Sequence, residues 1–165
     1  MPKRARCPHC DKLYGRDVID RHVQKCRMKN KVTLDPQSKA PTRTVIVDGN
    51  NIAYHLAPDG VPLVNNLILA YRSLTSRGLK PVFVISTALM HVIDKPNVLR
   101  DLIVQLEVVE APRGTNDDLK IIGVAMDRKA DIISNDRFLE WIGRYPWVTD
   151  RLRKYRMTPT GLILT

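Results

Sequence analysis

The chain has 165 residues, of which 44% are hydrophobic, and a formal net charge of +10. This length allows one domain of ordinary size with a small appendage, and the apolar fraction is sufficient for a packed core. No apolar run is long enough to cross a bilayer, and no apolar segment follows the basic N-terminus. We therefore expect neither a membrane protein nor a secretory signal, and we predict a cytoplasmic protein.

The positive charge is concentrated at the start of the chain. The first 44 residues contain 12 of the 27 basic residues but only 4 of the 17 acidic ones, so the remainder is nearly neutral. A basic segment of this kind binds polyanions. We expect a nucleic acid as the partner in preference to an acidic membrane surface, because no amphipathic apolar face accompanies the charge.

A metal-binding pattern lies within this basic segment. Its residues are separated by two, eleven and three positions, in the order Cys7, Cys10, His22 and Cys26. Thiolates and an imidazole at this spacing are typical of a tetrahedral Zn²⁺ site, and an odd number of cysteines favours metal binding over disulfides. His9 is the alternative ligand, but we expect its side chain to point away from the ion.

The pattern resembles a Cys-Cys-His-Cys zinc finger of the ββα kind, with Tyr14 and Ile19 at the positions of the two core apolar residues. A unit this small obtains its folding free energy from metal binding. We predict a zinc finger over residues 1–27, a basic linker over residues 28–43 and a second domain over residues 44–165. A tethered finger raises the local concentration of substrate at that domain.

Strands and helices alternate in the second domain, which predicts an α/β fold. The β-branched run Val45–Val47 indicates a buried strand that ends in a turn at Asp48-Gly49. Further strands are predicted at 81–86, 107–111 and 130–134, and helices at 62–78, 95–106 and 116–129. A short helix over 137–142, a turn through Pro146 and two strand-like segments, 154–157 and 162–165, complete the domain.

Acidic residues follow two of the predicted strands. Asp48 directly follows the first strand, and Asp136 closes the sequence Ser134-Asn135-Asp136 after the fourth. In an open α/β sheet the carboxyl ends of the strands form the ligand-binding edge. Two buried strands that end in acids therefore suggest a carboxylate site for a divalent metal ion.

Three further acids belong to this candidate site. Asp117 and Asp118 begin a predicted helix with Asn116 as its N-cap, and Glu140 lies four residues after Asp136, on the same face of the short predicted helix. Each acid alone has an ordinary explanation as a turn residue, a first-turn acid, a cap or a solvated charge. Their joint occurrence favours a cation, because close carboxylates raise one another's pKa unless a counterion neutralises them.

Three separated segments resemble the NYN branch of the PIN-like nuclease superfamily, most closely the Regnase-type ribonucleases. They are VIVDGNNIAYH, NDDLKIIGVAMDRKADIISNDRF and WVTDRLRKYRMTP. The resemblance implies a PIN-like three-layer α/β sandwich with a central parallel sheet in the order 3-2-1-4-5. It assigns the family's metal-site acids to Asp48, Asp117, Asp118 and Asp136, and its motif asparagine to Asn51.

Two features depart from that family. Glu140 stands where the family commonly has aspartate, and its side chain is one methylene longer. The family's eukaryotic members usually carry a Cys-Cys-Cys-His finger after the nuclease domain, whereas the predicted finger here is of another type and precedes it.

The implied function is a metal-dependent ribonuclease, expected to be an endonuclease, that acts on single-stranded or structured RNA. The strand order makes the first and fourth strands neighbours about 4.8 Å apart, so Asp48 and Asp136 can hold one ion. Carboxylate oxygens select Mg²⁺ or Mn²⁺ over zinc. Asp117 or Asp118 would hold the attacking water or a second metal ion, and Asn51 would hydrogen-bond a ligating carboxylate or the substrate.

Several other functions remain open at this stage. The acids are compatible with a non-catalytic RNA-binding protein, a PIN-like structure-specific DNA nuclease or a toxin-type PIN ribonuclease. A haloacid-dehalogenase-like phosphatase also begins with an aspartate at a strand end, but it needs a second acid two residues later, where this chain has Asn50.

Overall fold

The computed structural model describes residues 4–8, 12–30 and 43–165, except for the side chains of 27–30. The chain divides into two compact units, Met1–Gln37 and Ser38–Thr165. The predicted zinc ligand Cys10, its alternative His9 and residues 31–42 of the predicted linker lie outside the described residues. Within the described part of the chain, no helix combines the length and apolarity needed to span a membrane.

The first unit has the predicted ββα order. Strands β1 (Arg4–Arg6) and β2 (Leu13–Gly15) form an antiparallel pair, and helix α1 (Arg16–Asn30) follows directly. The helix continues three residues into the segment predicted as linker. Arginine, methionine and lysine are good helix formers, and no proline or glycine interrupts the sequence before Pro36. The described boundary between helix and linker is therefore later than the sequence predicted.

The second unit is built on a five-stranded parallel sheet in the order β5-β4-β3-β6-β7. Counted along the chain this is 3-2-1-4-5, which confirms the order implied by the family resemblance. The first strand begins one residue before the predicted domain start. The strands are β3 (Arg43–Asp48), β4 (Leu79–Ser86), β5 (Val108–Ala111), β6 (Asp131–Ile133) and β7 (Leu152–Arg153).

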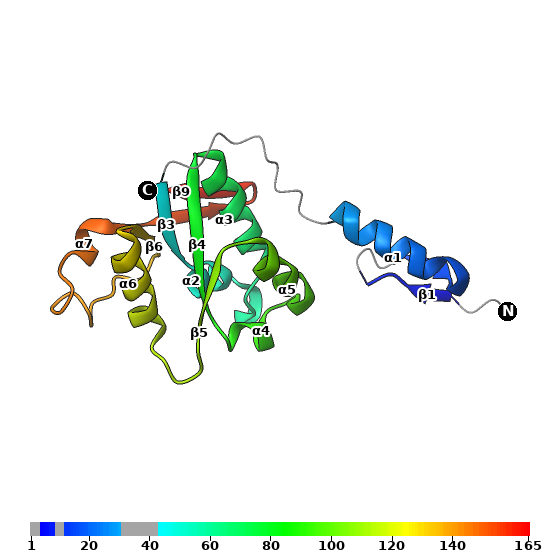
Figure 1. Ribbon diagram of the computed structural model, residues 1–165, viewed down its shortest axis with the longest axis horizontal. Coiled ribbons are helices and arrows are strands. Elements are labelled where there is room, and N and C mark those ends of the chain that lie inside the picture. The colour runs from blue at the N-terminus through cyan, green and yellow to red at the C-terminus, as the bar shows by residue number, and fades with distance from the viewer. Residues whose placement is uncertain (1–3, 9–11, 31–42) are drawn as a thin grey trace. The chain divides into compact units, whose positions relative to one another are not determined.

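Helices cover both faces of this sheet, as expected for a three-layer sandwich. Figure 1 shows α6 on one side of β3 and β4, and α3 and α5 on the other. The helices of this unit are α2 (Gly49–Tyr54), α3 (Val64–Ser76), α4 (Leu89–Val92), α5 (Pro96–Gln105), α6 (Asp117–Arg128) and α7 (Val148–Arg151), with a 3₁₀ turn at Pro58–Gly60. The segment after Asp48, predicted as a turn, is the start of α2.

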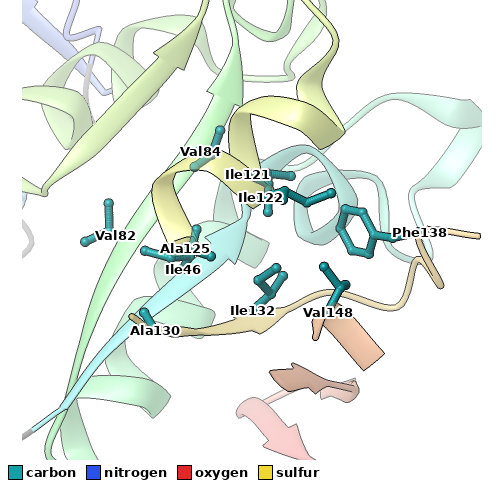
Figure 2. Close-up of a cluster of buried hydrophobic side chains, with 10 residues drawn as sticks. All are labelled: Ile46, Val82, Val84, Ile121, Ile122, Ala125, Ala130, Ile132, Phe138 and Val148. Atoms are coloured by element: carbon teal, nitrogen blue, oxygen red, sulfur yellow. The ribbon is translucent and has the colours of Figure 1, made fainter. Parts of the chain in front are cut away.

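The central strands are buried on both faces, which explains their unbroken apolar sequences. Alternate residues point to opposite sides, so Ile46 and Ile132 face α6 whereas Val47 and Phe83 face the other helix layer. The cluster on the α6 side is shown in Figure 2 and is closed by a buried aromatic ring, Phe138. This packing fixes α6 against β3, β4 and β6.

The C-terminal part differs from the prediction in two respects. The two strand-like segments pair with each other as a separate antiparallel hairpin, β8 (Tyr155–Thr158) and β9 (Gly161–Leu164), and the fifth strand of the main sheet is the short β7 before them. The helix predicted over 137–142 was wrong, because residues 137 and 138 have no regular secondary structure and residues 139–142 form turns. Phe138 has a positive φ of 52°, which is incompatible with a right-handed helix.

We predict opposite effects for two glycine-to-alanine substitutions. A Cβ at Gly49 would lie 2.5 Å from Ile85 Cγ2 and 2.9 Å from the Val84 carbonyl oxygen, whereas a Cβ at Gly123 would meet no atom within 4 Å. Gly49→Ala should lower the free energy of unfolding by roughly 1–3 kcal/mol through overpacking. Gly123→Ala should raise it by about 0.5–1 kcal/mol, because glycine is unfavourable in a helix. Denaturant unfolding of both variants measures these changes, and equal effects would contradict the packing described at the end of β3.

Candidate active site

The candidate site lies at the carboxyl ends of β3 and β6, where the helical connections change from one face of the sheet to the other. Val47 of β3 is paired with Ile133 of β6, so the next residues along the two strands, Asp48 and Ser134, emerge side by side. A topological switch point of this kind is the usual ligand-binding position in open α/β sheets. The fold therefore brings Asp48 to the predicted place.

Asp48 is an almost completely buried carboxylate, with 7% of the residue exposed. Its Oδ2 accepts a hydrogen bond from Ser134 Oγ at 2.8 Å, and its Oδ1 accepts one from the Asn51 backbone N–H at 3.2 Å. Burial raises the pKa of Asp48 to about 6 against the opposing effect of these hydrogen bonds, and the nearby charges of Asp118 and Asp136 add to the rise. The three carboxylates therefore act on one another, although they come from distant parts of the sequence.

Asp117 and Asp118 stand in the first turn of α6, as predicted. The Asn116 side chain accepts hydrogen bonds from the backbone N–H groups of Asp118 at 2.9 Å and Leu119 at 3.2 Å, which confirms Asn116 as the N-cap. Burial is the main cause that raises the pKa of Asp118, and the Asp136 carboxylate is the next. The helix dipole favours acids here, whereas partial burial and mutual repulsion oppose their ionisation.

Asp136 is an exposed residue in the loop after β6. Its Oδ1 accepts a hydrogen bond from the Phe138 N–H at 2.9 Å, and its own N–H donates to Ser134 Oγ at 3.1 Å. The Ser134 hydroxyl therefore links the loop that carries Asp136 to the carboxylate of Asp48. The sequence analysis named Ser134 only as part of the Ser134-Asn135-Asp136 motif. Its position immediately after a buried strand could have indicated that it belongs to the site.

A pocket of about 460 Å³ opens beside these acids. It is lined by Asp118 and by the continuous segment from Asn135 to Glu140. Glu140 reaches the pocket from a turn and not from the predicted helix, and its charge makes a small contribution to the raised pKa of Asp118. The lining of the pocket thus includes three acids, Asp118, Asp136 and Glu140, and one cation, Arg137.

Asp117 faces a different part of the site from Asp118. Its Oδ2 lies 3.5 Å from Asn50 Nδ2, and Asn50 exchanges hydrogen bonds with Ser86 at the end of β4 at 2.8 and 3.1 Å. Burial raises the pKa of Asp117. Asp117 therefore lies towards the end of β4, whereas Asp118 lies towards the loop after β6. Asn50 and Ser86 are two polar residues that the sequence analysis did not assign to the site.

Asn51 holds the loop after β6 and the C-terminal hairpin together. Its side-chain Oδ1 accepts hydrogen bonds from the Asn135 N–H at 3.0 Å and from the Tyr155 hydroxyl at 2.6 Å. Asn135 Oδ1 in turn accepts from the Tyr155 N–H at 3.0 Å. The contact with a carboxylate that was predicted for Asn51 is made by its backbone N–H to Asp48. No sequence signal indicated Tyr155, which is 104 residues away from Asn51.

Two cations border the acidic pocket. Lys154 Nζ donates to the carbonyl oxygens of Asn135 at 2.8 Å and Asp136 at 3.3 Å. Burial lowers the pKa of Lys154, and the neighbouring charge of Arg137 lowers it further. Arg137 lines the pocket, and no described residue forms an ion pair or hydrogen bond with its guanidinium group. The carboxylates thus have adjacent positive charges that leave donors available for an anionic ligand.

The donor set fits a hard divalent cation such as Mg²⁺ or Mn²⁺, because Asp48, Asp118 and Asp136 offer only carboxylate oxygens. The carboxylate oxygens of these acids lie farther apart than the ligand atoms of the finger. Within the described part of the chain, only Cys7, His22 and Cys26 bring three ligand atoms within 4.8 Å of one another. The described acids of the second unit form no cluster this compact.

The finger cluster contains three of the four predicted zinc ligands. Cys7 and Cys26 are buried, and the Cys7 N–H donates to the Lys12 carbonyl at 3.0 Å, next to the paired strands β1 and β2. The ring of His22 stacks on Tyr14 with the ring centroids 3.7 Å apart. Helix α1 thus presents His22 and Cys26 to Cys7 on the hairpin, as a ββα finger requires.

Comparison with known proteins gives a family and a fold. The family model described as Zc3h12a-like ribonuclease NYN domain matches residues 41–160. Two structures of nuclear protein-only RNase P 2 (PRORP2) from Arabidopsis thaliana have similar folds, with TM-scores of 0.60 and 0.59 and sequence identities of 21% and 22%. Each match covers 74% of this chain but only 29% of the PRORP2 chain. None of the curated proteins is similar enough in sequence to count as a relative.

We predict that Asn51→Ala destabilises the fold by about 1–3 kcal/mol, because it leaves the Asn135 N–H and the Tyr155 hydroxyl without their acceptor. Asn65→Ala is the matched control, since Asn65 is exposed on α3. That substitution should change the free energy of unfolding by less than about 0.5 kcal/mol. Urea unfolding of both variants measures the difference, and an Asn51→Ala variant as stable as the control would show that the linkage is unimportant.

Proposed function

This chain belongs to the family of Zc3h12a-like ribonuclease NYN domains, and we propose that it is a Mg²⁺- or Mn²⁺-dependent endoribonuclease that hydrolyses RNA phosphodiester bonds. The observation that carries the proposal is the buried Asp48 at the switch point of the sheet, whose carboxylate is influenced by the charges of Asp118 and Asp136, two acids that line the adjacent pocket. A buried carboxylate with a raised pKa and two acidic neighbours is an arrangement that a divalent cation stabilises.

The metal ion would be held by Asp48, Asp118 and Asp136. A bound divalent ion of this kind activates a water molecule for attack and neutralises charge on the phosphate. Asp117, on the β4 side of the site, would hold the attacking water or a second cation. Asn50 and Ser86 form hydrogen bonds that keep this side of the site in place. Glu140 contributes negative charge to the pocket from its turn and is not assigned as a ligand.

Substrate binding would depend on the cations next to the carboxylates. Arg137 has a guanidinium that no described residue pairs with, and this group suits a phosphate because it donates two parallel hydrogen bonds. Lys154 supports the loop that carries Asp136 and adds positive charge beside it. Hydrolysis by water would leave a 5′-phosphate and a 3′-hydroxyl without using the 2′-hydroxyl, so the choice of RNA over DNA rests on the family.

The finger would bind Zn²⁺ and increase the affinity for RNA. Its donor set of two thiolates and one imidazole, with Cys10 as the expected fourth ligand, is suited to zinc. Exposed basic side chains on α1, among them Arg16, Arg21 and Lys25, provide charge for phosphate contacts. Such contacts raise affinity for any sequence of bases, which agrees with a tethering role.

We predict that Asp136→Asn reduces RNA cleavage by about 100-fold or more and leaves RNA binding intact. The substitution removes one ligating charge, and several kcal/mol of transition-state stabilisation are expected from the metal. Asp127→Asn is the matched control, because Asp127 is an exposed acid on α6, and it should cleave like the unaltered protein. The measurements are single-turnover cleavage with Mn²⁺ and fluorescence anisotropy with a labelled RNA.

Two results would contradict this assignment: unchanged cleavage by Asp136→Asn, or cleavage that persists in excess EDTA. An unaltered protein that binds RNA without cutting it in Mn²⁺ would support a non-catalytic RNA-binding protein. Cleavage of DNA in preference to RNA would support a DNA nuclease.

For the finger we predict that Cys7→Ser abolishes bound zinc and raises the Kd for RNA, while kcat stays unchanged. The variant loses a ligand on which folding of the finger depends. His9→Gln, which alters the alternative ligand, should retain one zinc per chain and full affinity. Metal analysis and saturation kinetics measure both effects. An equal loss in kcat would show that the finger takes part in more than substrate capture.

A further inference from the structure

Trp141 contains a buried hydrogen-bond donor for which the described residues provide no partner. Its indole Nε1 is the one buried side-chain nitrogen or oxygen, among the residues that the structure describes, without a hydrogen bond. Leaving such a donor unpaired is unfavourable, and an exception of this kind calls for an explanation. The ring itself packs against the hydrophobic cluster that contains Phe138.

The Asp118 carboxylate is the candidate acceptor for this indole N–H. The indole N–H of Trp141 lowers the pKa of Asp118, which places the two groups close together, yet the pair does not have the geometry of a hydrogen bond. Asp118 lines the acidic pocket, and Trp141 directly follows Glu140 of the same pocket wall.

The position of Trp141 is fixed by its backbone. Its N–H donates to the Phe138 carbonyl at 2.9 Å, and its own carbonyl accepts from Tyr145 at 2.7 Å and Arg144 at 3.1 Å. These turn hydrogen bonds and the packed ring hold the indole in place. The Asp118 carboxylate, in contrast, is half-buried in the first turn of α6 and is repelled by Asp136, Asp117 and Glu140.

We propose that Trp141 is a positioning residue for the metal site: its indole N–H donates to one carboxylate oxygen of Asp118 and leaves the other oxygen for the divalent cation. The proposal rests on the proposed function, because it assigns Asp118 as a ligand. Carboxylates that bind metals are commonly oriented by a hydrogen bond to their second oxygen, and loss of such a partner lowers metal affinity by about 10–100-fold. The cation and the N–H act on different oxygens, so each favours the orientation that the other needs.

The first test follows the indole itself. The chain has two tryptophans, so a ¹⁵N-labelled sample of the full chain gives two indole N–H signals, and Trp147→Phe assigns them. Titration with Mg²⁺ should move the Trp141 signal downfield as the site fills and leave the Trp147 signal in place. Trp147 is a suitable internal control because it packs against the same cluster but lines a different pocket, with Met126 and Lys129.

The second test measures Mn²⁺ affinity by electron paramagnetic resonance of the free ion. Trp141→Phe keeps an aromatic ring but removes the donor, and it should weaken Mn²⁺ binding by about 10–100-fold. Trp147→Phe should bind Mn²⁺ like the unaltered protein. In an Asp118→Ala background, which lacks the acceptor, Trp141→Phe should cause no further loss.

The outcomes separate this inference from the proposed function. If the unaltered protein binds Mn²⁺ and Trp141→Phe binds it equally well, the positioning role is wrong and the nuclease proposal stands. An equal loss in the presence and absence of Asp118 would show a structural role only. If the unaltered protein binds no divalent cation, both proposals fail. If Trp141→Phe does not fold, the Mg²⁺ titration decides, and an unmoved Trp141 signal at saturation overturns the inference.

Discussion

The structure of the second unit depends on one buried carboxylate at the end of its central strand. Asp48 is held by the Ser134 hydroxyl and the Asn51 N–H, and yet burial raises its pKa to about 6. A protein gains nothing in stability from placing a carboxylate where its charge is disfavoured. The arrangement is understandable if the ionised form has a cation as its partner, and the neighbouring acids supply the further oxygens that such an ion needs.

Every neighbouring element contributes to keeping this group in place. The parallel register of β3 and β6 sets Ser134 beside Asp48, and the packed face of α6 fixes the helix whose first turn carries Asp118. Asn51 ties the loop after β6 to the C-terminal hairpin through Tyr155. Because these contacts link strands, helix and hairpin, the geometry of the site is a property of the whole sheet domain and not of a single motif.

The sequence predicted the strands β3 to β6, the helices α3, α5 and α6, and the positions of the acids in these elements, because burial and turn chemistry leave clear patterns. It did not predict β7, α2 or α4, which are short. The sequence did not predict the backbone conformation of residues 137–142, after Asp136. The charged and apolar residues over 137–142 have a composition that suits a helix. However, Asp136 Oδ1 accepts a hydrogen bond from the Phe138 N–H, and Phe138 has a positive φ with its ring buried in the core. This long-range packing overrides local preference. The Asn51–Tyr155 contact and the Trp141–Asp118 pair were also invisible, since nothing in a single sequence reports which distant side chains meet.

We propose that carboxylates from β3, α6 and the loop after β6 share one divalent cation. Crystals of the full chain soaked in Mn²⁺ test it most directly through anomalous scattering. We predict a single strong peak in the nuclease domain, bounded by carboxylate oxygens of Asp48, Asp118 and Asp136 at about 2.0–2.3 Å, distances typical of such ions. Contradiction would come from a map with no peak between these three residues while Mn²⁺ occupies other acidic sites on the same domain.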